Sequence, residues 1–469
     1  MNKKSKASSV KTPKTLKENK FSPFAIEIVR KLKQSGFQLK KISFKLLNKK
    51  SKASTPKILK ETKFSPLAIE VVRKLKKSGF RSYLVGGCVR DSMVGIKAKD
   101  FDVSTDATPE EIRKIFRSSR IIGKRFRLVH VFSRNELIEV STFRANDSKG
   151  HHSSGVVKDS EGKILRDNVW GTLEEDCIRR DFSINALYFD PIENDLCDFH
   201  NGLQHIQKKL LVSIGDPLVR FEEDPVRSLR AIRFSSKLNF KISSAVKEAI
   251  YQKGHLLGNI SNARMFDEFC KIFLTEKALK NFTKLDSFGV LKYLINTENY
   301  AEDSFGLRFQ HAALVNTDNR LKVSKSVTPG FLIAALLWPR LIDISKEKRG
   351  LNLRKFFRSM DRIIREQQVL TAVPRKFHGY IKDIWSLQLK LETRLGHQPY
   401  KILNHPRFRA AYDFLLLREE AAKDTQGMGD WWTQFQKVNR QGKIELLKSL
   451  RESRNGPVEK KFGFLGELS

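Results

Sequence analysis

The chain has 469 residues, enough for two to four compact domains. Apolar residues make up 40% and charged residues 30%, as in an ordinary globular protein. The net charge of +37 indicates a polyanionic partner, either nucleic acid or an anionic membrane. The longest apolar run, residues 331–338, is far shorter than the roughly 20 residues that cross a bilayer, so we expect no membrane partner.

The cysteine and histidine patterns predict no zinc or disulfide scaffold. Four cysteines are spread over the chain without a Cys-x-x-Cys pair, which fits a reducing compartment and predicts a cytoplasmic location. His151 and His152 lie beside each other in a stretch of glycine and serine, with no further ligand at a suitable spacing. We interpret this stretch as a loop rather than a metal site.

The N-terminal segment is basic and contains a duplication. Residues 1–82 carry a net charge of +20, which leaves +17 for the rest of the chain. The sequence of residues 20–33 recurs almost unchanged at 63–76, and each copy has a Ser-Pro start and helical apolar spacing. Only the second copy runs into the motifs described next. We therefore expect residues 1–62 to be a mobile basic leader and the first folded domain to begin at residue 63.

An alternation of short strands and helices follows, as in an α/β domain. We predict strands at 83–85, 99–103, 126–132 and 136–143, a helix at 89–93, and a further helix that starts at the capping box 108–111. Beyond about residue 217 the strand signals fade, and apolar positions at helical spacing predict helix throughout.

The strongest chemical signal combines a glycine pair with an Asp-x-Asp pair. Gly86 and Gly87 follow the first strand and precede a helix, where backbone N–H groups can approach a triphosphate. Asp100 and Asp102, two residues apart on a predicted strand, would point to one face and hold a pair of divalent cations. Each motif alone is weak, since a lone Asp-x-Asp is usually a solvated turn. Their order and spacing together are far more specific.

Three blocks of this sequence resemble the class II nucleotidyltransferases, which include bacterial poly(A) polymerases and CCA-adding enzymes. The blocks are Leu84-Val-Gly-Gly-Cys-Val-Arg-Asp91 with Asp100-Phe-Asp102, the segment 175–187 around Arg179-Arg-Asp-Phe182, and the segment 223–234. The resemblance implies an α/β nucleotidyltransferase palm domain at 63–215. It further implies an all-α neck at 216–280 that binds nucleotide and RNA, a helical body with a C-terminal RNA-binding arm at 281–440, and a tail at 441–469.

Within this family the finer match is to the bacterial poly(A) polymerases. It rests on residues 120–131, 166–171, 383–388, 405–413 and the pair Trp431-Trp432. CCA-adding enzymes generally lack the last three segments, but they remain the alternative within the family. The chain ends without the arginine-rich tail of many poly(A) polymerases, which puts in doubt any transfer of RNA contacts from such a tail.

The resemblance also implies roles for individual residues. Asp100 and Asp102 would ligate the metals, and Asp181 would be a third catalytic residue. Asp181 could instead be a buried partner of Arg179 or Arg180. Glu139 is a competing candidate for the third carboxylate, because strand alternation places it opposite Ile138 and Val140.

The remaining expected site residues would bind the nucleotide. They are Gly86, Gly87, Arg90, Asp91, Arg180, Asn185, Asp224, Arg227, Arg230 and Arg233. The last four share one face of a predicted helix at 223–234. In the family, the aspartate and the first arginine of this motif bond the base edge, since a carboxylate beside a guanidinium offers acceptors and donors in fixed geometry. The alternative is a set of surface ion pairs on a basic helix.

These features predict a template-independent polynucleotide adenylyltransferase that adds AMP from ATP to RNA 3′ ends, with two Mg²⁺ or Mn²⁺ ions as cofactors. RNA is the expected partner, RNA-decay factors are considered as further partners, and a monomer is the default. The alternatives are a CCA-adding enzyme and, from another class, a non-catalytic RNA-binding protein. Intact Asp100 and Asp102 argue against the last, because binding alone needs no metal carboxylates.

Overall fold

The computed structural model describes residue 59 and most of residues 64–455. The undescribed internal residues are 124–126, 134–135, 146–155, 159–163, 168–169, 299, 302–303, 349 and 423–426. Only the backbone is described at 156–158, 164–167 and 453–455. The first repeat copy and the His151-His152 pair therefore lie outside the described residues.

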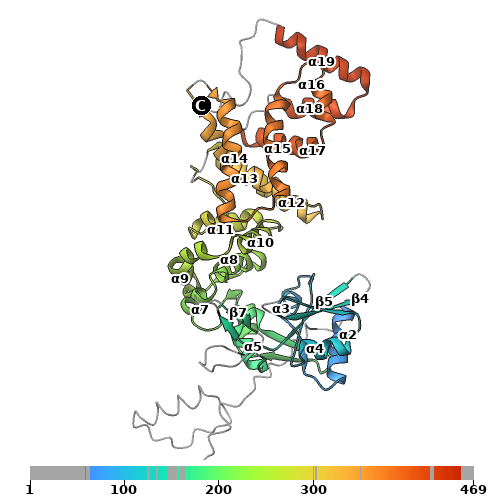
Figure 1. Cartoon of the computed structure of the whole chain (residues 1–469), viewed down its shortest axis with the longest axis vertical. Helices are drawn as coiled ribbons and strands as arrows, with labels where there is room; N and C mark the ends of the chain where they lie inside the picture. The colour runs from blue at the N-terminus through green and yellow to red at the C-terminus, as the bar shows by residue number, and fades with distance from the viewer. Residues whose placement is uncertain are drawn as a thin grey trace, which may run out of the picture. The chain divides into compact units, whose positions relative to one another are not determined.

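A seven-stranded sheet in the order β3-β4-β5-β2-β1-β8-β9 lies between Ser82 and Asp198 (Figure 1). We call the described chain up to residue 215, which contains this sheet, the head. The strands of the sheet are β1 (Ser82–Val85), β2 (Asp102–Thr105), β3 (Ser119–Ile122), β4 (Leu128–Ser133), β5 (Glu136–Thr142), β8 (Leu187–Asp190) and β9 (Asp195–Asp198). Neighbours pair antiparallel except β2 and β5, which are parallel. A separate hairpin joins β6 (Val156–Lys158) to β7 (Ile164–Asp167). The strand expected at 99–103 begins three residues late, and β3, β8 and β9 were not predicted.

Side-chain caps mark the start of three helices of the head, α2, α4 and α5. These helices are α2 (Pro66–Lys77), α3 (Gly87–Met93), α4 (Pro109–Ile115), α5 (Leu173–Arg179), the 3-10 helix η4 (Ser183–Asn185) and α6 (Gly202–Gln207). Ser65 caps α2, and the predicted capping box between Thr108 and Glu111 is present on α4. The second repeat copy is therefore helical, as predicted.

The two faces of the sheet differ in character. Leu84, Val103 and Val140 point to one face, where α2 and α4 complete an apolar core. Leu59 is buried in the same core, although we expected the domain to begin at residue 63. Because side chains alternate along a strand, Asp102 and Glu139 point to the opposite face. Asp102 and Glu139 thus lie on the face away from α2 and α4, which also carries a smaller apolar cluster around Val85 and Tyr188.

The rest of the described chain is almost entirely helical. Its helices are α7 (Pro217–Glu223), α8 (Val226–Leu238), α9 (Ser244–Lys253), the 3-10 helix η5 (Gly254–Asn259), α10 (Asn262–Phe273), α11 (Ala278–Ser287), the 3-10 helix η6 (Leu291–Tyr293), α12 (Phe305–Lys322), α13 (Pro329–Ser345), α14 (Leu353–Leu370), α15 (Lys376–Glu392), α16 (Gln398–Leu403), α17 (Phe408–Ala422), α18 (Met428–Lys437) and α19 (Arg440–Asn455). The prediction of helix throughout this part was wrong at three places, where the structure has the short strands β11 (Lys241–Ile242), β12 (Lys346–Glu347) and β13 (Gly350–Leu351).

One apolar core runs through these helices and also reaches into the head. The longest apolar run, residues 331–338, lies in α13, packed between α12, α14 and α15. Trp338 and Trp385 are buried there. Phe182, which precedes η4 of the head, joins the same core. The short strand β10 (Leu210–Leu211) pairs in parallel with β11, which ties the two parts together. None of the helices described is long and apolar enough to cross a membrane.

Candidate active site

A glycine turn links β1 to α3 beside the catalytic carboxylates. Gly86 has a φ of +72°, a conformation that L side chains rarely adopt. A Cβ at this position would lie 3.4 Å from Nη1 of Arg180 and 3.9 Å from Oδ2 of Asp102. The backbone conformation therefore favours glycine, although a Cβ would meet only ordinary van der Waals contacts, and the turn brings peptide groups next to Asp102.

The two aspartates do not share a strand. Asp102 is the first residue of β2, whereas Asp100 precedes the strand, so strand alternation alone does not aim both carboxylates. Both nevertheless line the same cavity. Glu139 is in register with Asp102 on the neighbouring strand β5, and its carboxylate lies 3.4 Å from Nε2 of His130. Unlike the two aspartates, Glu139 does not line the cavity.

The surroundings of Asp102 favour a bound cation. Burial raises the pKa of Asp102 to about 6, the nearby Glu139 and Asp100 carboxylates add to this rise, and Arg180 opposes it. A divalent cation would relieve this repulsion between carboxylates. Among the described residues no group of three His, Cys, Asp or Glu side chains is arranged as a metal site. Two carboxylates with further oxygens from water and phosphate match the way proteins usually hold Mg²⁺.

Asp181 belongs to a buried network of hydrogen bonds. Its Oδ1 accepts hydrogen bonds from the Phe182 amide at 2.8 Å and from Nδ2 of Asn185 at 2.9 Å. Its Oδ2 accepts one from Nε of Arg230 at 2.7 Å. Burial raises the pKa of Asp181, but Arg230 and the two hydrogen-bond donors lower it more, so it stays below its ordinary value. The carboxylate is therefore ionised and paired with Arg230 of α8.

The same hydrogen-bond network continues through the head and returns to α8. Nη1 of Arg90 donates a hydrogen bond to Oδ1 of Asn185, and Nε of Arg90 donates to Oδ1 of Asp91 at 2.8 Å. Nζ of Lys237 donates to Oδ2 of Asp91 at 2.7 Å. Arg230 and Lys237 are two turns apart on α8, so the two ends of this network hold the helix to the head.

Arg180 forms a second polar cluster beneath the glycine turn. Its Nε donates to the Tyr188 hydroxyl at 2.7 Å, and its Nη2 lies 3.4 Å from Oδ2 of Asp176. Burial lowers the pKa of Arg180, but Tyr188 and Asp176 raise it more, so it remains above its ordinary value. Its guanidinium is fixed beside Gly86 and Asp102 as a permanent positive charge.

The predicted helix at 223–234 is interrupted. Asp224 ends α7 in extended conformation, and α8 begins only at Val226, after Pro225. Oδ2 of Asp224 accepts a hydrogen bond from Nη2 of Arg264, on α10, at 2.8 Å. The prediction that residues 224, 227, 230 and 233 share one helix was therefore wrong for Asp224, although all four line the cavity.

Arg227 is held by acceptors of its own. Its Nη1 donates to the Arg220 carbonyl oxygen at 2.8 Å and to Oε2 of Glu223 at 3.1 Å. Arg220 in turn donates to the carbonyls of Arg179 and Arg180, which end α5. Asp224 and Arg227 are thus oriented from outside the cavity, by α10 and by α7 respectively.

Arg233 carries a buried donor that points to an anion. Burial lowers its pKa to about 10, and the neighbouring Arg230 lowers it further. Its Nε is buried without a hydrogen-bond partner in the described part of the chain, and its guanidinium carbon lies 4.7 Å from the centre of the Phe234 ring. An anion at this point would supply the missing acceptor.

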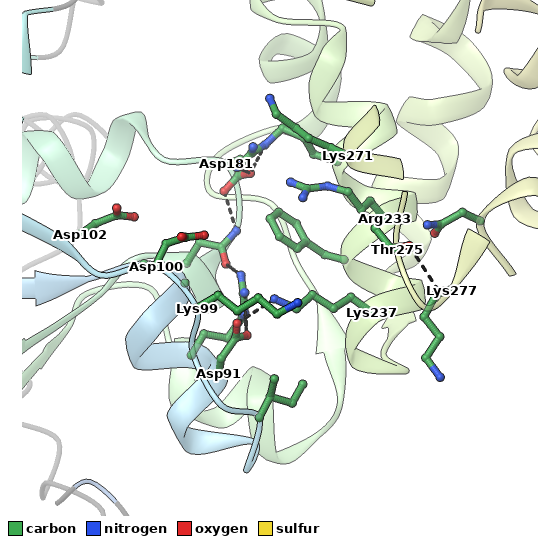
Figure 2. Close-up of a pocket in the computed structure, with 18 of the residues that line it drawn as sticks. Asp91, Lys99, Asp100, Asp102, Asp181, Arg233, Lys237, Lys271, Thr275 and Lys277 are labelled. Carbon is green, nitrogen blue, oxygen red and sulfur yellow. Dashed lines mark hydrogen bonds and ion pairs between the residues drawn. The ribbon is translucent and has the colours of Figure 1, made fainter. Parts of the chain in front are cut away.

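All thirteen site residues expected from the sequence line one cavity of about 910 Å³: Gly86, Gly87, Arg90, Asp91, Asp100, Asp102, Arg180, Asp181, Asn185, Asp224, Arg227, Arg230 and Arg233. Eleven Lys and Arg face six Asp and Glu around it, which makes it a net cationic site. Figure 2 shows Asp100 and Asp102 at one side of this cavity and Arg233 and Lys277 across from them. The arrangement suits an anionic nucleotide held opposite two acidic groups.

Several cavity residues were missed by the sequence analysis. The missed cations are Lys97, Lys99, Lys237, Lys271 and Lys277, together with Arg264, which supports the cavity through Asp224. Lys237 follows Arg230 and Arg233 at helical spacing and could have been found that way. The residues from α10 and the segment after it belong to no motif.

Three family models match this chain. The first is described as Poly A polymerase head domain and covers residues 82–212. The second, Probable RNA and SrmB- binding site of polymerase A, covers 239–298. The third, Polymerase A arginine-rich C-terminus, covers 351–462. The third match shows that the arginine-rich segment of these proteins has a counterpart here, although the chain ends in uncharged and acidic residues.

The chain is also similar to curated proteins over most of its length. It is 39% identical to Poly(A) polymerase I of Haemophilus influenzae, across 81% of this chain and 86% of that protein. It is 39% identical to Poly(A) polymerase I of Salmonella typhi, across 76% and 79%. A CCA-adding enzyme of Bacillus licheniformis is 37% identical but matches only 46% of this chain and 51% of that protein.

Solved structures share the fold. An apo form of a tRNA-processing enzyme superposes with a TM-score of 0.57 at 22% identity, covering 83% of this chain and 97% of that one. The Bacillus stearothermophilus CCA-adding enzyme in complex with CTP gives a TM-score of 0.52 at 24% identity, covering 82% and 84%. An α/β head followed by a helical body is therefore a known arrangement.

Proposed function

Because the chain belongs to the poly(A) polymerase family of nucleotidyltransferases, we propose that it is a template-independent polynucleotide adenylyltransferase. It transfers AMP from ATP to the 3′ hydroxyl of RNA and releases pyrophosphate. The observation that carries this function is the single cavity in which Asp100 and Asp102 face a cationic wall. Similarity to Poly(A) polymerase I over most of both chains supports it, while the CCA-adding enzyme matches about half.

Asp100 and Asp102 are the residues that would hold Mg²⁺, or Mn²⁺ in its place. Such ions, when bound, lower the barrier to in-line displacement by activating the attacking hydroxyl and neutralising the leaving pyrophosphate. The chain itself orients the triphosphate: Arg180 lies beneath the glycine turn, and Arg233 has a free buried donor. Arg90, Asp91, Asn185 and Asp181 act in this proposal by holding α8 against the head.

Asp224 and Arg227 select the base. A carboxylate accepts from an exocyclic amino group and a guanidinium donates to a ring nitrogen, so the pair matches the edge of adenine without a template. Each is held by residues outside the cavity, which favours one fixed arrangement. RNA itself is bound through the basic surplus of the helical part. The cytoplasmic location, the monomeric state and the RNA-decay partners remain predictions.

Purified protein is expected to extend a generic RNA with long homopolymer tails from ATP and to use CTP poorly. The measurement is electrophoresis of labelled RNA after incubation with Mg²⁺ and each nucleotide separately. A tRNA lacking its 3′ end serves as the second substrate. Addition of C, C and A to that tRNA, ending after three residues, would replace this proposal with the CCA-adding alternative. RNA binding without any addition would favour the non-catalytic alternative.

Arg264→Ala is expected to raise the KM for ATP and to reduce the preference for ATP over CTP by about fivefold to tenfold. The reason is that Asp224 loses its charged hydrogen-bond donor and is free to rotate. The measurement is kcat/KM for both nucleotides on one RNA. Lys253→Ala is the matched control, since it removes a neck cation whose partner Glu222 does not line the cavity. Equal effects of the two changes would show that Arg264 has no special role in base selection.

A further inference from the structure

A second, smaller cavity lies in the helical body, between α12, α13, α15 and α17. It has a volume of about 290 Å³ and is lined by Arg320, Tyr380, Arg407, Arg409 and Asp413, among others. We call it the body pocket. Three arginines face a single aspartate there, so it is cationic like the catalytic cavity.

Each arginine of the body pocket has a contact within the protein that positions its side chain before any ligand binds. The Asp413 carboxylate lies 3.0 Å from Nη2 of Arg409 and 3.6 Å from Nη1 of Arg320, which holds these two side chains at one wall. The guanidinium carbon of Arg407 lies 5.0 Å above the centre of the Tyr380 ring. A guanidinium held over an aromatic ring keeps its N–H groups free to donate, and a phosphate can accept hydrogen bonds from them. Within the described residues no carboxylate pairs with Arg407.

The two cavities border the same helix end. Leu321 lines the catalytic cavity and its neighbour Arg320 lines the body pocket. Consecutive residues of a helix point about 100° apart, so the two cavities border neighbouring faces of the last turns of α12. Oδ1 of Asp318 accepts a hydrogen bond from the Ala278 amide, which keeps α12 against the segment that carries Lys277. Lys277 lies across the catalytic cavity from Asp100 and Asp102 (Figure 2).

We propose that the body pocket binds a phosphodiester group of the RNA strand, upstream of the 3′ end that occupies the catalytic cavity. A strand leaving the aspartates past Lys277 and Leu321 meets the end of α12 and then the three arginines. Arg407 donates to the phosphate, Arg320 and Arg409 add charge, and Tyr380 positions Arg407. This inference rests on the proposed function, because it assigns a second contact to the same RNA substrate.

The test is the affinity of the full-length protein for single-stranded RNAs that grow by one nucleotide at a time, measured by fluorescence anisotropy without ATP. Wild-type affinity is expected to rise in a step once the strand reaches the pocket. Arg407→Ala should lose that step, about fivefold to tenfold in affinity, and its salt dependence should become shallower by about 0.7 per lost phosphate contact. Arg407→Lys should keep the salt dependence, and Tyr380→Phe should keep the step.

Arg354→Ala is the matched control, because it removes an exposed arginine of α14 that lies outside the body pocket. An equal loss in both variants, or a step that survives in Arg407→Ala, would overturn the proposal. A changed KM for ATP on a short RNA would also overturn it, since the pocket would then be a nucleotide site. Failure of wild-type protein to add AMP would count against the proposed function alone, because the affinity series does not need catalysis.

Discussion

Asp102→Asn is expected to reduce AMP addition by about a thousandfold or more while RNA affinity stays within about twofold of wild type. Asn keeps the shape of the side chain but loses the charge that would hold the metal, whereas RNA is bound by lysines and arginines elsewhere. Asp100→Asn should behave in the same way. The measurements are single-nucleotide addition with saturating ATP and anisotropy of labelled RNA. Residual addition within tenfold of wild type in either variant would contradict the metal assignment.

Thermal unfolding gives an independent check on Asp102. Burial and the neighbouring carboxylates raise its pKa to about 6 from an ordinary value of 3.8, so its ionised form opposes folding. The contribution of Asp102 to the free energy of unfolding of the wild-type protein should therefore fall as the pH rises from about 4 through about 6. In EDTA at pH 7, Asp102→Asn should be at least as stable as wild type, and any gain should vanish below about pH 4. Glu139→Gln shows whether that carboxylate also contributes to catalysis.

Asp181→Ala is expected to lower both activity and stability, the second by about 3 kcal/mol. The change leaves Arg230 without its carboxylate, and it leaves the Asn185 amide and the Phe182 N–H without an acceptor. Because α8 then loses one of its ties to the head, we expect a higher KM for ATP as well as a lower kcat. Chemical denaturation and steady-state kinetics measure the two effects.

A double variant separates positioning from metal binding. Arg230→Met in the Asp181→Ala background removes the unpaired charge, so it should recover part of the lost stability but none of the activity. If Asp181 also ligated a metal, Asp181→Ala would lower kcat without raising the KM for ATP, whatever its effect on stability. The pair of results therefore decides between the catalytic role implied by the family resemblance and the positioning role indicated by the contacts.

Short-range patterns predicted the local structure well. The Ser-Pro start of α2 and the capping box of α4 involve groups within one turn, so neighbouring residues alone determine them. The alternation of apolar side chains placed Glu139 away from Ile138 and Val140, because that alternation is a property of a single strand. All thirteen site residues that the motifs predicted line one cavity.

Partners far apart along the chain could be found only in the tertiary structure. Asp181 pairs with Arg230, 49 residues away, and Arg264 with Asp224, 40 residues away. No local pattern distinguishes these arginines from the many others of a chain with 89 Lys and Arg, because which charges meet depends on how α8 and α10 pack. The late start of β2 has a similar origin, since a strand begins where a neighbouring strand offers hydrogen bonds, and Asp102 is the first residue paired with β1 and β5.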